Sequence, residues 1–162
     1  MANRSNLIAD GIMHLKVPPP VVVLIGLGLL YLGDRQLPSF SLSFPGQISL
    51  AIVLLASGLA IGCHALFRFI MAKTTFNPTT PDKVNVLVTN GLYRFSRNPM
   101  YVADVLLLLS LAAYYGTLTV AAVVPLFIWY LTEFQIKPEE DHLKSKFGKD
   151  YLSYKARVPR WI

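Results

Sequence analysis

Apolar residues gather along this sequence into four runs that are separated by polar segments. The runs cover about residues 17–33, 47–72, 99–115 and 117–134, and the first and third are the shortest. A helix needs about 20 mostly apolar residues to cross a bilayer, with about 17 at the short end of the range. The pattern therefore predicts an all-α membrane protein with about four transmembrane helices, in one domain of residues 1–162.

The polar residues lie in two blocks. The first is a loop at about residues 73–98, which is rich in turn-forming residues and becomes strand-like at residues 84–89. The second is a tail at residues 135–162, where Pro138 and the acidic residues behind it predict a helix that ends near Gly148, followed by a second short helix. We expect the loop and the helical tail to fold together as an ordered cap over one end of the bundle.

The third run opens with a helix-start signal. Asn98 is a favoured N-cap residue, and Pro99 is favoured at the first helical position because its missing N–H is not needed there. We expect the open N–H groups at this helix start to face the polar loop.

Composition agrees with a membrane location. Of all residues 54% are hydrophobic and only 15% are charged, which is apolar for a water-soluble domain. The single cysteine, Cys63, excludes an intramolecular disulfide, and its place in the second run favours a packing role.

The basic residues are distributed unevenly about the four runs. Arg35 alone lies between the first and second runs, whereas most of the others lie in the loop and the tail. The positive-inside rule then predicts that the loop, the tail and both termini are cytoplasmic, which fits a prokaryotic inner membrane. The net charge of +6 is thereby explained by topology, and we expect no nucleic-acid partner.

Soluble cofactor-binding signatures are missing from the sequence. It has no G-x-G-x-x-G after a strand, no Walker sequence, and no pair of Cys or His at metal-ligand spacing. We expect no metal site, and a nucleotide-type ligand must be held in another way.

Two segments could together hold a nucleotide-type ligand. Residues 87–101 contain Gly91, Tyr93 and Arg97-Asn98-Pro99-Met100-Tyr101, and residues 137–159 contain Glu139-Glu140, Phe147-Gly148, Tyr151 and Tyr154. This arrangement resembles the isoprenylcysteine carboxyl methyltransferase family and the related phospholipid N-methyltransferases. Their pattern is glycine-tyrosine, then arginine-histidine-proline with a tyrosine two positions on, then paired glutamates before a tyrosine-rich end.

The resemblance implies a membrane methyltransferase that uses S-adenosylmethionine. Its acceptor would be lipophilic or delivered through the membrane, and would react through a carboxylate, an amine or a thiol. Glu139 would hold the ammonium of the cofactor. The adenosine would lie against the loop and the start of the third run, at Asn85, Val86, Leu87, Val88, Gly91, Tyr93, Asn98, Pro99, Met100 and Tyr101.

Physical chemistry independently favours such a site. The cofactor carries two cationic groups and a carboxylate, so it needs an acidic partner, a positive or N–H-rich partner, and apolar walls. Glu139 or Glu140 provides the first, Arg97 the second, and residues such as Leu143 the third. Each group alone has a plainer explanation, such as headgroup anchoring for Arg97, but their combination in this order favours a site.

The sequence departs from the family pattern at two positions. Asn98 replaces the histidine and cannot titrate near pH 7, so we expect no obligatory proton acceptor there. Gln135 replaces an arginine that faces the substrate in isoprenylcysteine enzymes, which leaves the acceptor open. The catalytic candidates are Gln135, Glu133 as a weak base, and Arg157, which could equally anchor the tail at the membrane surface.

Three polar residues inside the apolar runs are candidates for lining a substrate channel. His64 and Arg68 are four positions apart on one helix face, and Asp104 lies early in the third run. Polar groups at membrane depth usually line a cavity or pair with one another. Both possibilities are open for these three residues.

Two other functions are open from the sequence alone. A membrane reductase related to the sterol reductases would bind NADPH in the same cytoplasmic pocket, although 162 residues leave little room for the nicotinamide half. A non-enzymatic scaffold that retains the fold would bind no cofactor, and Asn98 and Gln135 are the features that favour it.

Overall fold

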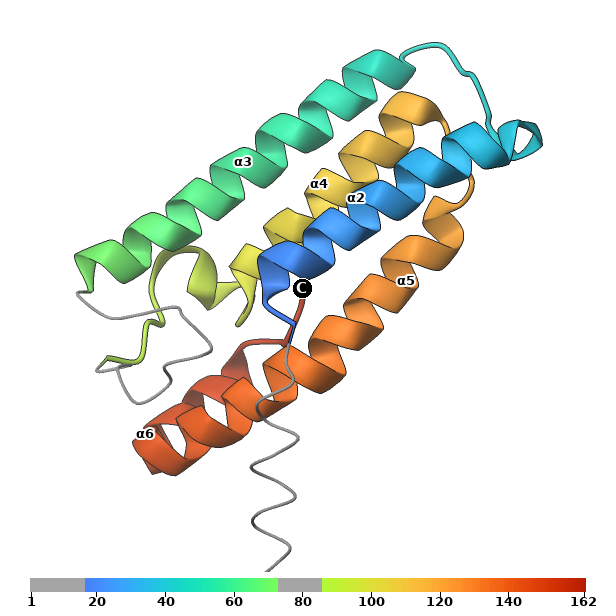
Figure 1. Ribbon diagram of the computed structural model, residues 1–162. Coiled ribbons are helices and arrows are strands. Elements are labelled where there is room, and N and C mark those ends of the chain that lie inside the picture. Colours follow the sequence, from blue (N-terminus) through green and yellow to red (C-terminus); the bar gives the residue numbers. More distant parts are fainter. Residues whose placement is uncertain (1–16, 73–85) are drawn as a thin grey trace, which may run out of the picture.

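The computed structural model describes residues 17–72 and 86–162, and these residues are all-α (Figure 1). No sheet forms among them, and an isolated bridge joins Ser41 to Thr117. The elements in chain order are α2 (Pro19–Gln36), the 3-10 helix η1 (Pro38–Phe40), α3 (Gln47–Met71), the 3-10 helix η3 (Gly91–Arg94), α4 (Pro99–Tyr115), α5 (Val120–Leu131), the π-helix η4 (Thr132–Ile136) and α6 (Lys137–Arg157).

Two helical stretches in the described part of the chain are long and apolar enough to cross a membrane. They are α3, with a mean hydropathy of 2.2, and the continuous stretch Val120–Arg157, with 1.3, while α4 is a shorter apolar helix. Large side chains on α3 face outward: Ile52 is 60% exposed and Ile70 is 63% exposed. An extended apolar surface of this kind is typical of contact with lipid. These features indicate a membrane protein.

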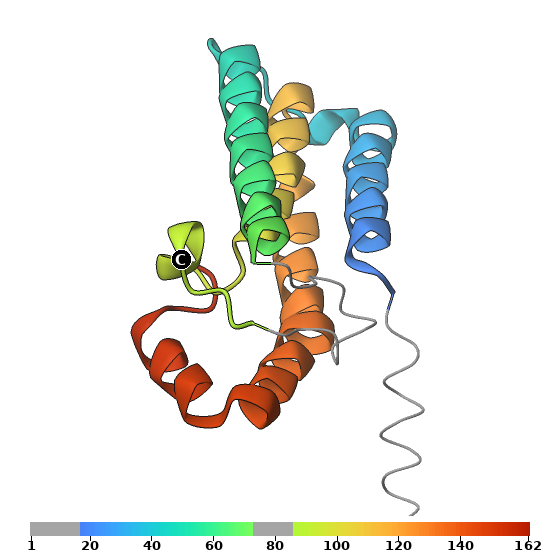
Figure 2. The ribbon, with the colours of Figure 1, turned by 90° about the vertical axis from the view of Figure 1, so that its left-hand side faces the viewer.

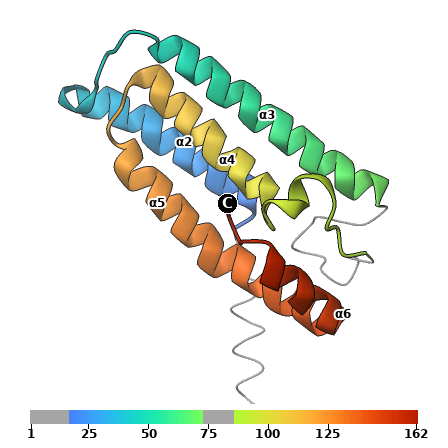
Figure 3. The same ribbon diagram turned by 180° about the vertical axis from the view of Figure 1, so that it is seen from behind.

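Helix α4 occupies the middle of the bundle. It packs along α3 on one side and also contacts α2 and α5 (Figures 1 and 3). Glycines permit close approach at two of these contacts. A Cβ at Gly26 would lie 2.9 Å from Leu108 Cδ2, and one at Gly58 would lie 3.2 Å from the carbonyl oxygen of Ala103.

The main core lies where α2, α4 and α5 meet. Leu30, Leu108 and Leu131 are fully buried in it. On another face of α4, the Ser110 hydroxyl donates a hydrogen bond of 2.8 Å to the carbonyl oxygen of Ala51 in α3. Because lipid is as apolar as leucine, such close packing and interhelical hydrogen bonding hold the helices together more than exclusion of water does.

A left-handed glycine turns the chain from α4 into α5. Gly116 has a φ of 69°, which glycine adopts without steric cost. Its carbonyl oxygen accepts a hydrogen bond of 2.8 Å from Leu42 N, and Leu118 N donates one of 2.7 Å to the carbonyl oxygen of Phe40. The segment that follows α2 is thereby attached to the hairpin.

The two-part helical tail predicted from the sequence is confirmed. Gly148 has non-helical dihedrals (φ 51°, ψ −119°) and divides α6 into two parts. The second part turns back, so that the C-terminal segment reaches η3 (Figure 2). A small second core forms there from Tyr151, Tyr154 and Val158, with Leu87, Leu143 and Phe147 packed against it.

The strand-like expectation for residues 84–89 is wrong where the structure describes them. Residues 86–89 adopt no regular secondary structure. Their apolar residues serve another purpose, because Leu87 packs against the Tyr151 core instead of pairing with a second strand.

Candidate active site

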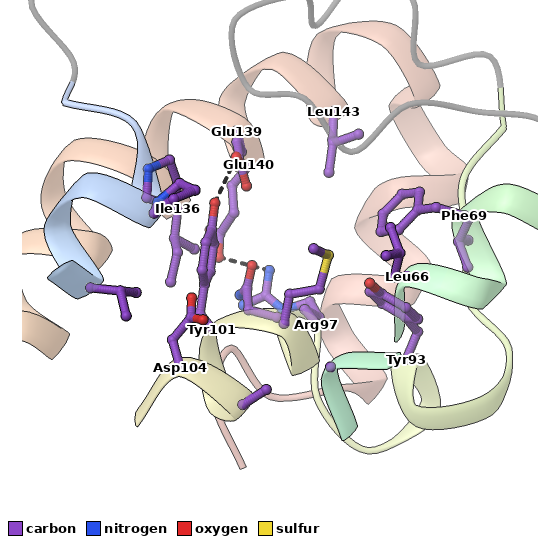
Figure 4. Close-up of a pocket in the computed structure, with 18 of the residues that line it drawn as sticks. Leu66, Phe69, Tyr93, Arg97, Tyr101, Asp104, Ile136, Glu139, Glu140 and Leu143 are labelled. Carbon is purple, nitrogen blue, oxygen red and sulfur yellow. Dashed lines mark hydrogen bonds and ion pairs between the residues drawn. The ribbon is translucent and has the colours of Figure 1, made fainter. Parts of the chain in front are cut away.

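A cavity of about 880 Å³ lies at the end of the bundle where η3 and α6 meet the long helices. This volume is within the range of about 300–1,000 Å³ that is usual for small-molecule sites. One half, which we call the polar chamber, is lined by Tyr93, Arg97, Tyr101, Glu139 and Glu140 (Figure 4). The other half, which we call the apolar groove, lies between α2 and α3 and is lined by Val23, Leu24, Gly58, Leu59, Gly62, Ala103 and Leu107.

Aromatic and aliphatic side chains form one wall of the polar chamber. Phe69 of α3 meets Tyr93 of η3 edge to face, with ring centroids 5.4 Å apart. The Tyr154 hydroxyl donates a hydrogen bond of 2.7 Å to the carbonyl oxygen of Tyr93, which ties η3 to α6. Burial raises the pKa of Tyr93 and of Tyr154 well above the ordinary value, so both phenols stay neutral.

Glu140 accepts contacts from three cations. Its Oε1 lies 3.0 Å from Arg97 Nη1 and 2.7 Å from Arg160 Nε, and its Oε2 lies 3.0 Å from Lys155 Nζ. The side chains of Arg97 and Glu140 are only 9% and 7% exposed. A buried charge is tolerated only when it is paired in this way.

The Glu140 carboxylate stays ionised at neutral pH. Burial opposes its ionisation, but hydrogen bonds from Arg160 and Lys155 and the charge of Arg97 outweigh burial and lower the pKa from 4.5 to about 2. The same hydrogen bond raises the pKa of Arg160 above its ordinary value. Glu140 therefore has a structural role, since its carboxylate joins α6 to Arg97 and Arg160.

Arg97 has a donor that the described residues do not use. Its Nη1 contacts Glu140 and also donates a hydrogen bond of 3.0 Å to the Tyr151 hydroxyl. Its Nε is buried and has no hydrogen-bond partner among residues 17–72 and 86–162. A buried unpaired N–H is rare in native structures and suits an anionic ligand group.

Glu139 provides a second carboxylate on the chamber wall. Its Oε1 accepts a hydrogen bond of 3.0 Å from the Tyr101 hydroxyl (Figure 4). This bond joins the start of α6 to the first turn of α4. It also orients the carboxylate, since a rigid phenol on a helix holds one of its two oxygens.

The C-terminal segment is hydrogen-bonded to the turn that precedes α4. Asn98 Nδ2 donates a hydrogen bond of 2.9 Å to the carbonyl oxygen of Arg160, and Arg97 N donates one of 3.0 Å to that of Pro159. Asn98 occupies the N-cap position of α4, but its side chain makes no capping bond, contrary to the usual role of asparagine there. The amide instead fastens the chain end to the turn that carries Arg97.

Most of the cofactor-binding residues predicted from the sequence lie together. Of these, the cavity lining includes Val86, Leu87, Val88, Tyr93, Arg97, Asn98, Met100, Tyr101, Glu139, Glu140 and Leu143, and it includes Asp104 of the predicted channel. Pro99 is buried at the start of α4 without lining the cavity. Asn85 lies outside the described residues.

His64 and Arg68 of α3 lie against Gly91 of η3 and do not line the cavity. Gly91 (φ 65°) approaches both, and a Cβ there would lie 2.6 Å from His64 Nε2 and 3.5 Å from Arg68 Cδ. These two residues therefore support the turn that carries Tyr93.

The three catalytic candidates from the sequence lie elsewhere. Gln135 is buried, and its Nε2 donates a hydrogen bond of 2.8 Å to the carbonyl oxygen of Val17. Glu133 pairs with Lys137, one turn along the helix at the surface. Arg157 is exposed and donates to the carbonyl oxygen of Ser153. None of the three lines the cavity.

Several lining residues were missed by sequence reasoning. Leu66 and Phe69 of α3 look like ordinary membrane-facing residues, and only their three-residue spacing beside Gly62 hints at one shared face. Arg160 does not line the cavity, but its contact with Glu140 agrees with the expectation that it could reach the site.

A family profile covers most of the bundle and the site. The profile described as phospholipid methyltransferase matches residues 47–150, from the start of α3 into α6. No solved structure shows a significant match.

Three relatives are similar to parts of the chain. An uncharacterized protein of Haemophilus influenzae is 40% identical over 63 residues, which are 39% of this chain and the whole of that protein. Protein-S-isoprenylcysteine O-methyltransferase of Schizosaccharomyces pombe is 26% identical over 129 residues, 78% of this chain and 55% of the relative. The cobalt-zinc-cadmium resistance protein CzcN of Cupriavidus metallidurans is 36% identical over 80 residues, 49% of this chain and 37% of the relative.

Proposed function

The chain belongs to the phospholipid methyltransferase family, and we propose that it transfers a methyl group from S-adenosylmethionine to a lipophilic acceptor that enters from the membrane. The observation that carries the proposal is one cavity in which the polar chamber opens into the apolar groove. A charged cofactor needs a polar site and a lipid-like acceptor needs an apolar one. The two sites must adjoin, because the methyl group passes directly from one molecule to the other.

The polar chamber offers the groups that the cofactor requires. We assign its ammonium to Glu139 and its carboxylate to Arg97, whose Nε has no partner among the described residues. Tyr93 and Leu143 supply walls for the adenosine. When bound, S-adenosylmethionine supplies a methyl group that is already electrophilic.

The protein's task is then to position the reactants and exclude water. The buried Arg97–Glu140 pair holds the turn before α4 against α6. Tyr101 fixes the Glu139 carboxylate through the hydrogen bond of 3.0 Å. Positioning of this kind can supply a large part of the rate enhancement of a two-substrate reaction.

The apolar groove suits the hydrocarbon part of an acceptor. Val23 and Leu24 of α2 lie on one side of it, and the small residues Gly58 and Gly62 of α3 lie on the other. Each of the three helices α2, α3 and α4 contributes residues from about one turn to the groove, and these residues are apolar or small.

We also propose a topology. Helices α2, α3, α4 and α5 each cross the membrane, with the chamber and both termini on the cytoplasmic side of a prokaryotic inner membrane. Arg35 lies in the last turn of α2, at the far end from the chamber, whereas α6 carries lysines and arginines on the chamber side. This distribution is the one that the positive-inside rule favours.

Calorimetric titration of the detergent-purified protein with S-adenosylhomocysteine tests the proposal. We expect saturable binding of this product and none of NADPH in a parallel titration. Binding of NADPH instead would favour a reductase, and no binding of either would favour a scaffold.

Glu139→Gln tests the assignment of the ammonium. The substitution keeps the shape and removes the charge, and a hydrogen bond to a charged group is worth about 1.5–3 kcal/mol. We expect binding of S-adenosylhomocysteine to weaken about 10–100-fold. Glu133→Gln is the matched control, because it removes a surface carboxylate that pairs with Lys137. Equal affinities in the two variants would remove Glu139 from the site.

A further inference from the structure

We infer that the junction of α3 and η3 binds an anionic phospholipid at a site separate from the cavity. The site, which we call the basic site, consists of His64 and Arg68 of α3 and Arg94 of η3. The lipid bound there is an effector and not a methyl acceptor, because its phosphate joins the two elements from outside the chamber. The basic site does not depend on the proposed methyl transfer, and only its expected effect on cofactor affinity does.

The two basic residues of α3 lie on the side of the helix away from the cavity. Leu66 and Phe69 line the cavity (Figure 4), whereas His64 and Arg68 do not. At 3.6 residues per turn, Arg68 lies about 200° around the helix from Leu66, and His64 lies about one turn from Arg68. A ligand held by this pair is therefore distinct from any molecule in the chamber or the groove.

The 3-10 helix η3 adds a third basic side chain. Its Gly91 approaches α3 so closely that a Cβ there would lie 2.6 Å from His64 Nε2 and 3.5 Å from Arg68 Nε. Residues three positions apart in a 3-10 helix lie in line, so Arg94 is on the same side of η3 as Gly91. The three basic side chains therefore start from one junction, and that of Arg94 is exposed.

The described part of the chain does not neutralise this cluster. Arg68 Nε is buried and has no hydrogen-bond partner among residues 17–72 and 86–162. His64 and Arg94 form no ion pair with a carboxylate of these ranges either. A buried guanidinium N–H without a partner is rare, and it suits a phosphate, which arginine can bind through two parallel hydrogen bonds.

The surface beside the cluster favours a lipid as the source of the phosphate. Phe67 and Met71 flank the basic residues of α3 and are 53% and 63% exposed. Arg68 lies in the last turn of this apolar helix, where the hydrocarbon region of a bilayer gives way to headgroups. Basic pockets between membrane helices at this depth bind anionic headgroups. A zwitterionic lipid would bring its ammonium beside the same cations, so a lipid with net negative charge is favoured.

Occupation of the basic site should affect the polar chamber through η3. Tyr93 lies in the same short helix as Arg94, and its ring packs edge to face on Phe69 in the chamber wall. A phosphate that joins Arg68 to Arg94 holds η3 against α3 and orders this wall before the cofactor binds. The cofactor then restricts less motion on binding, so the anionic lipid raises its affinity.

Thermal unfolding of the full-length protein in a neutral detergent tests the basic site without the cofactor. We expect added phosphatidylglycerol to raise the Tm by about 5 °C, because a ligand of the folded state stabilises that state. Phosphatidylcholine and glycerol phosphate should have little effect. No rise with phosphatidylglycerol, or an equal rise with phosphatidylcholine, would overturn the inference. An equal rise with glycerol phosphate would identify a free phosphate ester as the ligand and overturn the lipid.

Arg68→Gln tests the residues. We expect this variant to lose the rise in Tm with phosphatidylglycerol, whereas Lys144→Gln, which removes an exposed cation from α6, should keep it. Arg94→Gln changes an exposed side chain and should also lose most of the rise, so it decides the inference if Arg68→Gln does not fold. An unchanged rise in the arginine variants, or an equal loss in Lys144→Gln, would overturn the basic site.

Titration with S-adenosylhomocysteine in lipid nanodiscs tests the coupling. Replacing part of the phosphatidylcholine by phosphatidylglycerol should raise the affinity at least about 5-fold, the lower end of usual coupling between two sites. Arg68→Gln should abolish this increase and leave the affinity in phosphatidylcholine alone unchanged. An affinity that is independent of phosphatidylglycerol would overturn the coupling. No binding of S-adenosylhomocysteine at all would overturn the coupling and the proposed function, while a retained rise in Tm would leave the lipid site standing.

Discussion

The two adjacent glutamates of α6 have different roles, which their neighbours determine. Glu140 contacts Arg97, Lys155 and Arg160, whereas Glu139 accepts a hydrogen bond from Tyr101 and lines the chamber. The family resemblance implies Glu139 as the cofactor's partner, whereas charge alone leaves Glu139 and Glu140 equivalent. The distinction depends on Arg160, which approaches from 20 residues further along the chain.

Removal of the Glu140 charge should destabilise the fold. Glu140→Gln leaves Arg97 buried without its counter-ion, a change that typically costs about 3–5 kcal/mol. We expect a clearly lower Tm in detergent than for Glu133→Gln, whose surface pair contributes at most about 1 kcal/mol. Equal melting temperatures for the two variants would show that the buried contacts carry no net stability.

The depressed pKa of Glu140 also sets an acid limit on stability. A carboxyl whose pKa falls from 4.5 in the unfolded chain to about 2 in the folded one binds fewer protons when folded. Its contribution is complete above about pH 5.5 and is lost progressively as the pH falls from 4.5 toward 2. Acid unfolding followed by circular dichroism should show this loss, and Glu140→Gln should abolish that part of the pH dependence.

At the scale of elements, the pattern of apolar runs predicts α3, α4 and the hairpin at Gly116 well. The division of α6 at Gly148 was also predictable, because Pro138 and the acidic residues after it mark the start of its first part and Gly148 marks the end. The strand expected before η3 was wrong because apolar residues in a short segment serve equally to cover a neighbouring helix. Gln135 was a candidate because it replaces a family arginine, and Glu133 and Arg157 because their charges lie near the predicted site. None of the three lines the cavity.

Two left-handed glycines at the same end of the bundle allow a controlled test of element packing. Gly116 (φ 69°) and Gly46 (φ 84°) both incur a backbone cost of about 1–2 kcal/mol when replaced by alanine. A Cβ at Gly116 would also collide with the carbonyl oxygen of Leu42, whereas one at Gly46 would meet nothing within 4 Å.

Gly116→Ala should therefore lower the Tm much more than Gly46→Ala does. Neither variant should change the affinity for S-adenosylhomocysteine while folded, since the chamber lies at the opposite end. Similar Tm values for both variants would mean that the segment containing Leu42 shifts away from the new Cβ at position 116 without loss of stability.

At the scale of the whole molecule, the proposed topology places η1 and α6 on opposite sides of the membrane. The chain has one cysteine, so Cys63→Ser provides a background for introduced ones. Ser39 and Ser145 are both exposed. With Ser39→Cys, an impermeant maleimide should label intact cells, and with Ser145→Cys it should label only permeabilised ones. The reverse pattern would invert the topology.

The return of the C-terminal segment to the start of α4 has a consequence for biosynthesis. Asn98 and Arg160 meet although 62 positions separate them. During translation, α2 to α5 can enter the membrane while residues 158–160 are still inside the ribosome, at about 5–20 residues per second. The nascent bundle then lacks the C-terminal contacts to Asn98, Arg97 and Glu140. If the proposed function holds, membrane insertion and acquisition of cofactor affinity are separate events, and a chain stalled before residue 158 should be inserted without binding S-adenosylhomocysteine.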